Sequence, residues 1–111
     1  MAKPRIAING FGRIGRAVFR MVSMKDDIEV VAINDITPNE TLAYLTRFDT
    51  VYGRYPGVVT LKGDTMTAGT QTVQMLEQED PAKLPWGKLG VDVVVEATGG
   101  YELIVMAALG A

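Results

Sequence analysis

The sequence has 111 residues, a length that predicts one domain with room for a hydrophobic core. Its formal net charge of −2, with both signs scattered along the chain, argues against nucleic acid or an anionic membrane as a partner. Cysteine and histidine are absent, which excludes disulfides, zinc–thiolate sites, a thiol nucleophile and the commonest general base, and we expect no metal site. No leader-like segment or apolar run of about 18 residues occurs, so we expect a cytoplasmic protein.

The first third of the chain predicts a strand, a helix and a second strand. Residues 5–9 form a short apolar run that is typical of a buried strand. The helix that follows carries apolar residues at the spacing of one face, namely Ile14, Ala17, Val18, Met21 and Val22. Residues 28–33 are a second β-branched run, which we expect to lie parallel to the first. Together these segments have the size of a βαβ unit.

A second helix is predicted after residue 37. Thr37 can serve as its N-cap, Pro38 suits the first helical position, and Glu40 completes a capping box. The residues expected to face the core are Leu42, Leu45 and Phe48.

The rest of the chain predicts further strands and a final helix. Residues 58–67 suggest a small β-hairpin, and residues 72–76 alternate like a third strand of the main sheet. Asp80 is expected to cap a helical turn. Residues 91–96 form an apolar fourth strand, and residues 101–109 have apolar positions at helical spacing.

A glycine loop at residues 9–16 carries the spacing G-x-G-x-x-G at Gly10, Gly12 and Gly15. The first glycine allows a sharp strand-to-helix bend, the second lets backbone approach a pyrophosphate, and the third lets helix pack on strand. The helix start offers unpaired N–H groups to the phosphates. Such a triplet alone is weak, because glycine turns often only join elements.

Asp35 strengthens the cofactor hypothesis. It ends the second strand and follows Gly15 by 20 residues, where a carboxylate can accept hydrogen bonds from the adenosine ribose hydroxyls. It also favours NAD over NADP, since a 2′-phosphate would meet a like charge. The alternative is that Asn34 and Asp35 only cap or turn the chain.

Other polar residues have more ordinary explanations. Thr98 and Gly99 follow the fourth strand and either approach a ligand or form a plain turn. Turns, caps and strand ends account for Asp64, Asp80, Asp92 and Glu96. Arg16 is expected to be solvated. We therefore assign no catalytic residue.

Several motifs together resemble the N-terminal part of the NAD-binding domain of phosphorylating glyceraldehyde-3-phosphate dehydrogenases. The segments that carry the resemblance are residues 7–16, 31–35, 48–54, 80–81, 86–87 and 94–99. Erythrose-4-phosphate dehydrogenases share most of these motifs but usually carry Glu at the position of Asp35. The resemblance implies a Rossmann-like α/β fold with a parallel sheet of order 3-2-1-4, helices on both faces and a β-hairpin insertion. The chain would stop before the last two strands of the family's domain.

The resemblance also implies a cofactor site. Backbone at Arg13 and Ile14 would hold the pyrophosphate, and Ile36 stands where an apolar residue accompanies NAD preference. Glu79 replaces an Arg that commonly contacts adenine through its backbone. The full expected set is Asn9, Gly10, Phe11, Gly12, Arg13, Ile14, Gly15, Asn34, Asp35, Ile36, Glu79, Thr98, Gly99 and Tyr101.

The family's nucleophilic Cys and its His partner lie beyond the region matched here, so we expect no activity from this chain alone. Three hypotheses remain open: an inactive module that binds NAD or another adenine nucleotide, a part of a dehydrogenase that another chain completes, and a structural module with a vestigial site. An exposed fourth strand at the sheet edge predicts self-association into a homo-oligomer through residues 91–96 or the helix at residues 101–109.

Overall fold

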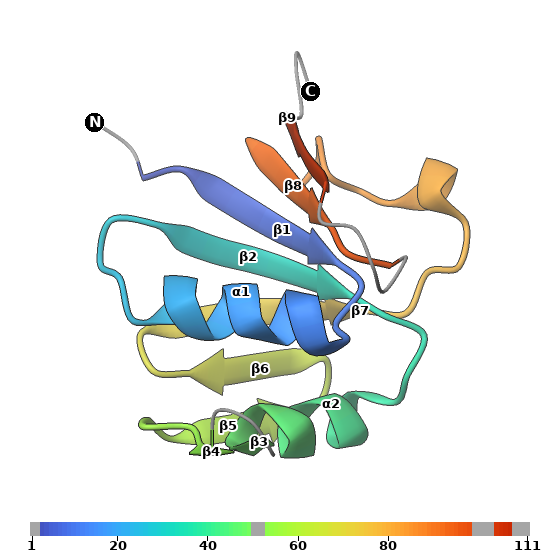
Figure 1. The fold of residues 1–111 in the computed structure, drawn as a ribbon. Coiled ribbons are helices and arrows are strands. Elements are labelled where there is room, and N and C mark those ends of the chain that lie inside the picture. The colour runs from blue at the N-terminus through green and yellow to red at the C-terminus, as the bar shows by residue number, and fades with distance from the viewer. Residues whose placement is uncertain (1–2, 50–52, 99–103, 108–111) are drawn as a thin grey trace.

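The computed structural model describes residues 3–49, 53–98 and 104–107. The α-helices are α1 (Arg13–Ser23) and α2 (Asn39–Arg47), and a 3₁₀ helix, η1, spans Pro81–Lys83. The strands are β1 (Arg5–Asn9), β2 (Glu29–Asn34), β3 (Phe48–Asp49), β4 (Gly53–Arg54), β5 (Val59–Lys62), β6 (Thr65–Ala68), β7 (Gln71–Leu76), β8 (Val93–Glu96) and β9 (Ile104–Ala107). Figure 1 shows one main sheet with both α-helices in front of it.

Four parallel strands form the centre of the sheet in the order β7-β2-β1-β8. This arrangement confirms the predicted order 3-2-1-4. A single row of partners, Val95, Ile8, Ile33 and Met75, crosses all four strands. Every member of that row is buried, so apolar side chains on one face hold the register.

The predicted hairpin is also confirmed. β5 and β6 pair antiparallel, and β6 continues the main sheet by pairing antiparallel with β7. Gly63 in the connecting turn has a φ of +62°, a conformation that favours glycine. β3 and β4 form a separate two-stranded sheet after α2.

Helix α1 turns only part of the predicted face to the sheet, since Val22 is buried and Val18 packs against the core. Its buried residues are Gly15, Phe19, Val22 and Ser23, whereas Met21 is 65% exposed. A Cβ on Gly15 would collide with the carbonyl oxygen of Gly10 and lie 3.3 Å from Cγ2 of Ile8 in β1, so the helix packs closely on the end of β1 at this glycine. The face that contains Gly15 therefore packs inward, and the prediction for Met21 was wrong.

Helix α2 begins without the predicted capping box. Pro38 occupies the N-cap position, and no side chain caps the helix. Thr37 lies one residue before the N-cap, and its N–H donates to Oδ1 of Asp35 at 2.9 Å. Leu42 is buried as expected, but Phe48 is 45% exposed.

The end of the chain differs from the prediction. Residues 104–107 form strand β9, which pairs antiparallel with β8, so they are not helical. The β-branched pair Ile104 and Val105 suits a strand, and β8 gains a partner for its second edge. The prediction that β8 is an exposed edge was therefore wrong. Residues 101–103 and 108–109 of the predicted helix lie outside the described part.

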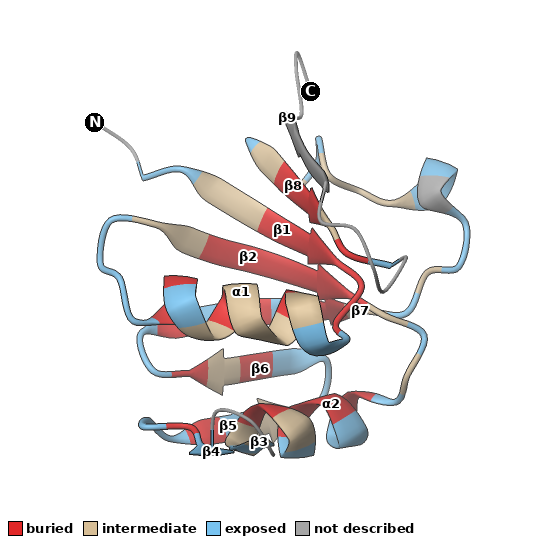
Figure 2. Ribbon diagram, in the orientation of Figure 1, coloured by how far each residue is buried: buried red, intermediate tan, exposed pale blue. Residues whose placement is uncertain are grey.

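Two apolar clusters cover the two faces of the sheet. The larger one joins Phe19 of α1 and Leu42 of α2 to the row that crosses the parallel strands. The smaller one contains Ala7 and Val94, with Trp86 and Leu89 packed against it. The α-helices thus cover one face, and the segment after η1 covers the other. Figure 2 shows burial concentrated in the central strands and in the helix faces turned toward them.

Candidate functional site

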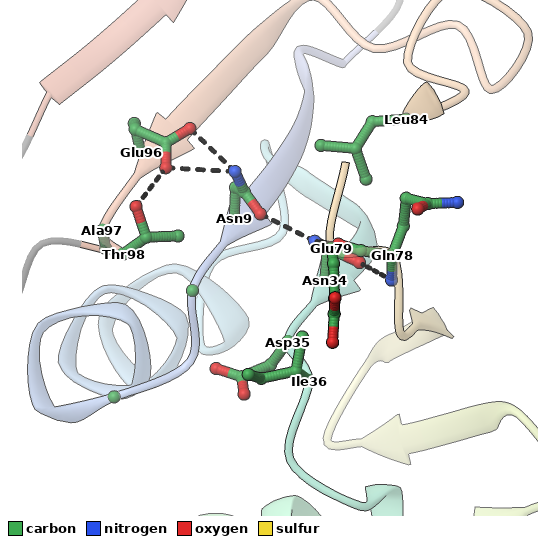
Figure 3. A pocket seen from close by; sticks show the side chains of 12 residues that line it. Asn9, Asn34, Asp35, Ile36, Gln78, Glu79, Leu84, Glu96, Ala97 and Thr98 are labelled. Atoms are coloured by element: carbon green, nitrogen blue, oxygen red, sulfur yellow. Dashed lines mark hydrogen bonds between the residues drawn. The ribbon is translucent and has the colours of Figure 1, made fainter. Parts of the chain in front are cut away.

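A cleft of about 970 Å³ opens where the parallel strands end at their carboxyl termini. Its lining residues are Asn9, Gly10, Gly12, Asn34, Asp35, Ile36, Gln78, Glu79, Leu84, Glu96, Ala97 and Thr98 (Figure 3). The chain leaves β1 toward β2 on one side, and β8 lies on the other. In open α/β sheets this change of direction creates a crevice where ligands bind.

Gly10 is required by the architecture of the cleft. Its φ is +97°, and a Cβ would lie 2.7 Å from the carbonyl carbon and oxygen of Ala97. Its N–H donates to the carbonyl oxygen of Asn34 at 2.7 Å. The first glycine of the loop therefore lets the backbone after β1 pass between the ends of β2 and β8.

Gly12 differs from Gly10, because a Cβ at Gly12 would clash with no protein atom. Its φ is −78°, and a Cβ there would meet no atom within 4 Å. Gly12 lines the cleft and is the N-cap of α1, with no side chain that caps the helix. The first-turn N–H groups of a helix need partners from outside the helix. The open space at Gly12 fits the close approach of a phosphate.

Asp35 connects the end of β2 to the glycine loop. Its Oδ2 accepts a 2.7 Å hydrogen bond from the N–H of Phe11, and its Oδ1 accepts one from Thr37. Partial burial raises the pKa of the Asp35 carboxyl. The hydrogen bonds from Phe11 and Thr37, with the charge of Arg16, outweigh burial and hold that pKa below its ordinary value. The carboxylate is therefore charged and already fixed in orientation.

An amide network ties the ends of four strands together on the other side of the cleft. Nδ2 of Asn9 donates to both oxygens of Glu96, at 3.0 and 2.9 Å. Nδ2 of Asn34 donates to Oδ1 of Asn9 at 2.8 Å and to the carbonyl of Gln78 at 2.9 Å. The hydroxyl of Thr98 donates to Glu96 at 2.8 Å. Figure 3 draws the contacts that link Asn9 to Glu96 and Asn34 and that link Thr98 to Glu96. Together these hydrogen bonds give the cleft a fixed polar wall.

The cleft brings together most of the residues that the sequence singled out. Those that line it are Asn9, Gly10, Gly12, Asn34, Asp35, Ile36, Glu79 and Thr98. Those that do not are Phe11, Arg13, Ile14 and Gly15. Phe11 instead buries its ring edge-on to Phe19, with 5.7 Å between the ring centroids. Gly99 and Tyr101 lie outside the described residues.

Sequence reasoning missed three lining residues, Gln78, Leu84 and Ala97, and assigned Glu96 only as a strand end. Gln78 lies two residues past the end of β7, so its place at the carboxyl edge of the sheet was a usable signal. Arg16 was expected to be solvated, but its side chain is only 15% exposed. That prediction was wrong, because Nη1 donates to the carbonyl of Phe11 at 3.0 Å.

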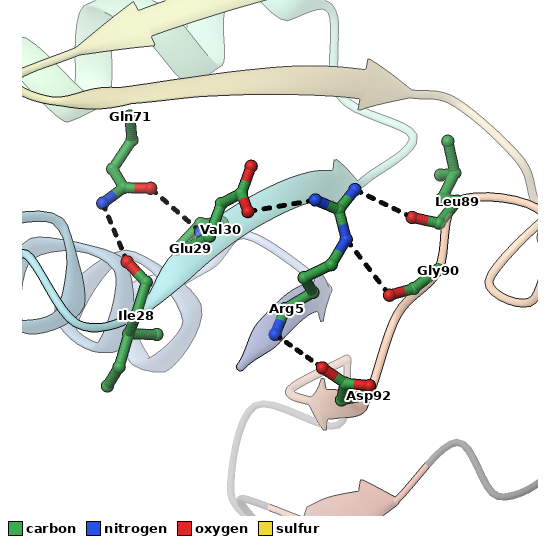
Figure 4. A network of polar contacts seen from close by, with 8 residues as sticks. All are labelled: Arg5, Ile28, Glu29, Val30, Gln71, Leu89, Gly90 and Asp92. Atoms are coloured by element: carbon green, nitrogen blue, oxygen red, sulfur yellow. Dashed lines mark hydrogen bonds and ion pairs between the residues drawn. The ribbon is translucent and has the colours of Figure 1, made fainter. Parts of the chain in front are cut away.

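The opposite end of the sheet is held by a different polar network, shown in Figure 4. The guanidinium of Arg5 donates to the carbonyls of Leu89 and Gly90 and pairs with Glu29 at 3.0 Å. Asp92 accepts a 2.9 Å hydrogen bond from the N–H of Arg5. These contacts join β1 to the turn before β8 and leave the cleft untouched.

Two kinds of feature are absent from the part of the chain that the structure describes. No group of three or more Asp, Glu, His or Cys side chains gathers as a metal site there. Within the same residues, no helix is both long and apolar enough to cross a membrane.

Comparison with known proteins gives one consistent family. Residues 4–103 match the family described as glyceraldehyde 3-phosphate dehydrogenase, NAD binding domain. The chain is 55% identical over 102 residues to a glyceraldehyde-3-phosphate dehydrogenase of Mycobacterium avium, covering 86% of this chain and 30% of that protein. It is also 48% identical over 95 residues to a glyceraldehyde-3-phosphate dehydrogenase of Haemophilus influenzae, covering 86% of this chain and 28% of that protein. The chain thus spans less than a third of the length of these curated relatives.

Proposed function

We propose that this chain, which belongs to the family of glyceraldehyde 3-phosphate dehydrogenase NAD-binding domains, binds NAD in the cleft and is inactive as a dehydrogenase by itself. One observation carries the proposal. The charged Asp35 and the open backbone at Gly12 line the same cleft, as a ribose acceptor and a place for phosphate. The third glycine, Gly15, lets α1 approach β1 closely enough to bring its N-terminus to that point.

Within this proposal the residues have separate roles. Asp35 accepts hydrogen bonds from the adenosine ribose, because each carboxylate oxygen keeps a lone pair after binding one backbone N–H. The backbone from Gly12 to Ile14 holds the pyrophosphate. Ile36, which is 66% exposed, offers an apolar surface beside the ribose site. Thr98 lines the far side of the cleft. The family resemblance assigns cofactor contacts to Gly99 and Tyr101 as well, which lie outside the described residues.

Preference for NAD over NADP is part of the proposal. A 2′-phosphate on the ribose would bring negative charge beside the Asp35 carboxylate, which its low pKa keeps ionised. The other charged residues that line the cleft, Glu79 and Glu96, are also acidic. We therefore expect calorimetric titration to give a Kd for NADP at least tenfold higher than the Kd for NAD.

Thermal unfolding with and without nucleotide tests the binding itself. Ligand at about a hundredfold over its Kd adds roughly 2.7 kcal/mol to the free energy of unfolding. For a domain of this size, that addition raises Tm by on the order of ten degrees. Absence of a shift with NAD, ADP-ribose and ATP would refute the proposal and favour a structural module with a vestigial site.

A second candidate function is a role as part of a dehydrogenase that another chain completes. The favouring observation is that the chain has a built cleft for a cofactor but contains no cysteine or histidine to act as nucleophile or base. Turnover of glyceraldehyde 3-phosphate by the purified chain would contradict inactivity. Turnover only after a second chain is added would support this candidate.

Homo-oligomer formation is also proposed, at a surface different from the one that the sequence predicted. β9 is the last strand of the described sheet on its side, so its outer backbone edge takes the place that β8 was expected to have. Light scattering at micromolar concentration tests this directly, and a monomer mass throughout would remove it.

A further inference from the structure

Arg16 is mostly shielded from solvent, which is an unfavourable environment for a charged guanidinium. It lies in the first turn of α1, and its side chain is 15% exposed. Nη1 donates to the carbonyl oxygen of Phe11, and Nε lies 3.9 Å from Oδ2 of Asp49 in β3. A buried guanidinium costs free energy unless hydrogen bonds and opposite charge compensate it. Solubility therefore does not explain why an arginine occupies this partly shielded site.

The contacts of Arg16 complete a three-point attachment of Phe11. The ring of Phe11 is buried against Phe19, and its N–H donates to Asp35 at 2.7 Å. Its carbonyl oxygen accepts from Arg16 at 3.0 Å. The two peptide groups that flank Phe11 are therefore each held by a charged side chain, one directly after β2 and one in α1.

Fixing the carbonyl of Phe11 also fixes the N–H of Gly12. The two groups belong to one planar trans peptide and point in opposite directions. Because Arg16 holds the carbonyl, the Gly12 N–H cannot rotate freely. Gly12 lines the cleft, where its missing Cβ leaves space. A donor held in one orientation binds an anion without the entropic cost of ordering a flexible loop.

We propose that Arg16 is a positioning residue of the glycine loop, which holds the Phe11–Gly12 peptide in the orientation that receives the ligand's phosphates. This inference rests on the proposed NAD binding for its ligand. Arg16 acts through the backbone, so it contributes to the binding of phosphate-bearing ligands and not to that of the adenosine portion. Its pairing with Asp49 keeps the guanidinium in place between the loop and β3.

Two ligands separate this role from general destabilisation. NMR titration measures the affinity for ADP-ribose and for adenosine in four proteins. These are the wild type, Arg16→Met, Arg16→Lys and the control variant Lys25→Met. We expect Arg16→Met to lower the affinity for ADP-ribose at least tenfold and the affinity for adenosine less than twofold. Arg16→Lys should recover most of the affinity, because its ammonium group can still donate to the Phe11 carbonyl. Equal losses for both ligands, or unchanged ADP-ribose affinity, would overturn the proposal.

Amide exchange without ligand tests the same role independently of NAD. Arg16→Met frees the Phe11 carbonyl, and the loosened loop no longer keeps the neighbouring Phe11 N–H on Asp35. The Phe11 amide should therefore exchange at least tenfold faster, while the Val30 amide in β2 should match the Lys25→Met control. If Arg16→Met does not fold, Arg16→Leu, which also lacks a side-chain donor, carries the same expectation. Unchanged Phe11 protection would overturn the positioning role even if NAD binds. Faster Phe11 exchange in a protein whose wild type binds no nucleotide would support positioning and refute only the proposed function.

Discussion

The backbone N–H of Phe11 donates a 2.7 Å hydrogen bond to Oδ2 of Asp35, and this contact joins the two features that the sequence places 24 residues apart. It means that the acid at the end of β2 holds the glycine loop as well as facing the cleft. Stability and ligand binding are therefore coupled at one carboxylate. Changes at Asp35 should affect both, whereas changes at its neighbours can separate them.

Replacing Asp35 with Asn tests that coupling. The Asn carbonyl oxygen can accept one of the two backbone N–H bonds, but its amide group cannot accept the other. We expect the free energy of unfolding to fall by about 1 kcal/mol. NAD affinity should fall about tenfold, and the ratio of NADP to NAD affinity should rise. Urea unfolding and calorimetric titration of the same preparation measure both effects. An unchanged ratio would contradict the role of Asp35 in choosing the cofactor.

The pKa of Asp35 predicts how stability depends on pH. This pKa lies below its ordinary value of 3.8, because hydrogen bonds from Phe11 and Thr37 outweigh the effect of burial. A carboxyl with a lowered pKa in the folded state stabilises the protein fully above its unfolded pKa and loses that contribution as pH falls through the folded pKa. The stability advantage of the wild type over Asp35→Asn should be constant from pH 7 to about 5 and shrink below about pH 4. A constant advantage down to pH 2.5 in urea unfolding would contradict the pKa shift.

The parts of the site that could be predicted depend on local sequence. The strand, glycine turn, helix, strand and acid occur within about 30 residues, so spacing alone places Gly10 and Asp35 at one edge of the sheet. The parallel strand order follows from short crossovers and apolar runs. These features need no knowledge of distant contacts.

The features that could not be predicted depend on partners far away in the chain. Burial of Arg16 depends on Asp49, which lies 33 positions later, and on a backbone carbonyl. Residues 104–107 fit a helical spacing as well as a strand, and pairing with β8 decides between them. Met21 has the helical spacing of the predicted apolar face of α1. The close packing of Gly15 on the end of β1 instead turns the face with Gly15 inward and leaves Met21 exposed.

The first glycine of the loop should be needed for folding. Gly10→Ala places a Cβ 2.7 Å from the backbone of Ala97 in a conformation with φ of +97°. We expect a loss of about 2 kcal/mol or more in the free energy of unfolding, from strain and from displacement of the strand end. A melting temperature within two degrees or so of the wild type would show that the loop can rearrange at that position.

The second glycine should be needed for binding alone. A Cβ at Gly12 meets no protein atom within 4 Å, so Gly12→Ala should change the free energy of unfolding by less than about 1 kcal/mol. The same methyl group occupies the space proposed for phosphate, and NAD affinity should fall at least tenfold, or about 1.4 kcal/mol. Full affinity for NAD in Gly12→Ala would place the pyrophosphate somewhere else in the cleft.

Arg5 provides the converse case, a residue that should affect stability without affecting binding. Its guanidinium donates to two carbonyls and pairs with Glu29 at the end of the sheet opposite the cleft (Figure 4). The Arg5 side chain is 39% exposed, so solvent screens the ion pair and the two carbonyl contacts dominate. Arg5→Met should lower the free energy of unfolding by about 1 kcal/mol and leave the Kd for NAD unchanged at temperatures well below Tm. If the variant instead weakens NAD binding as much as Gly12→Ala does, binding depends on the whole sheet rather than on its carboxyl edge.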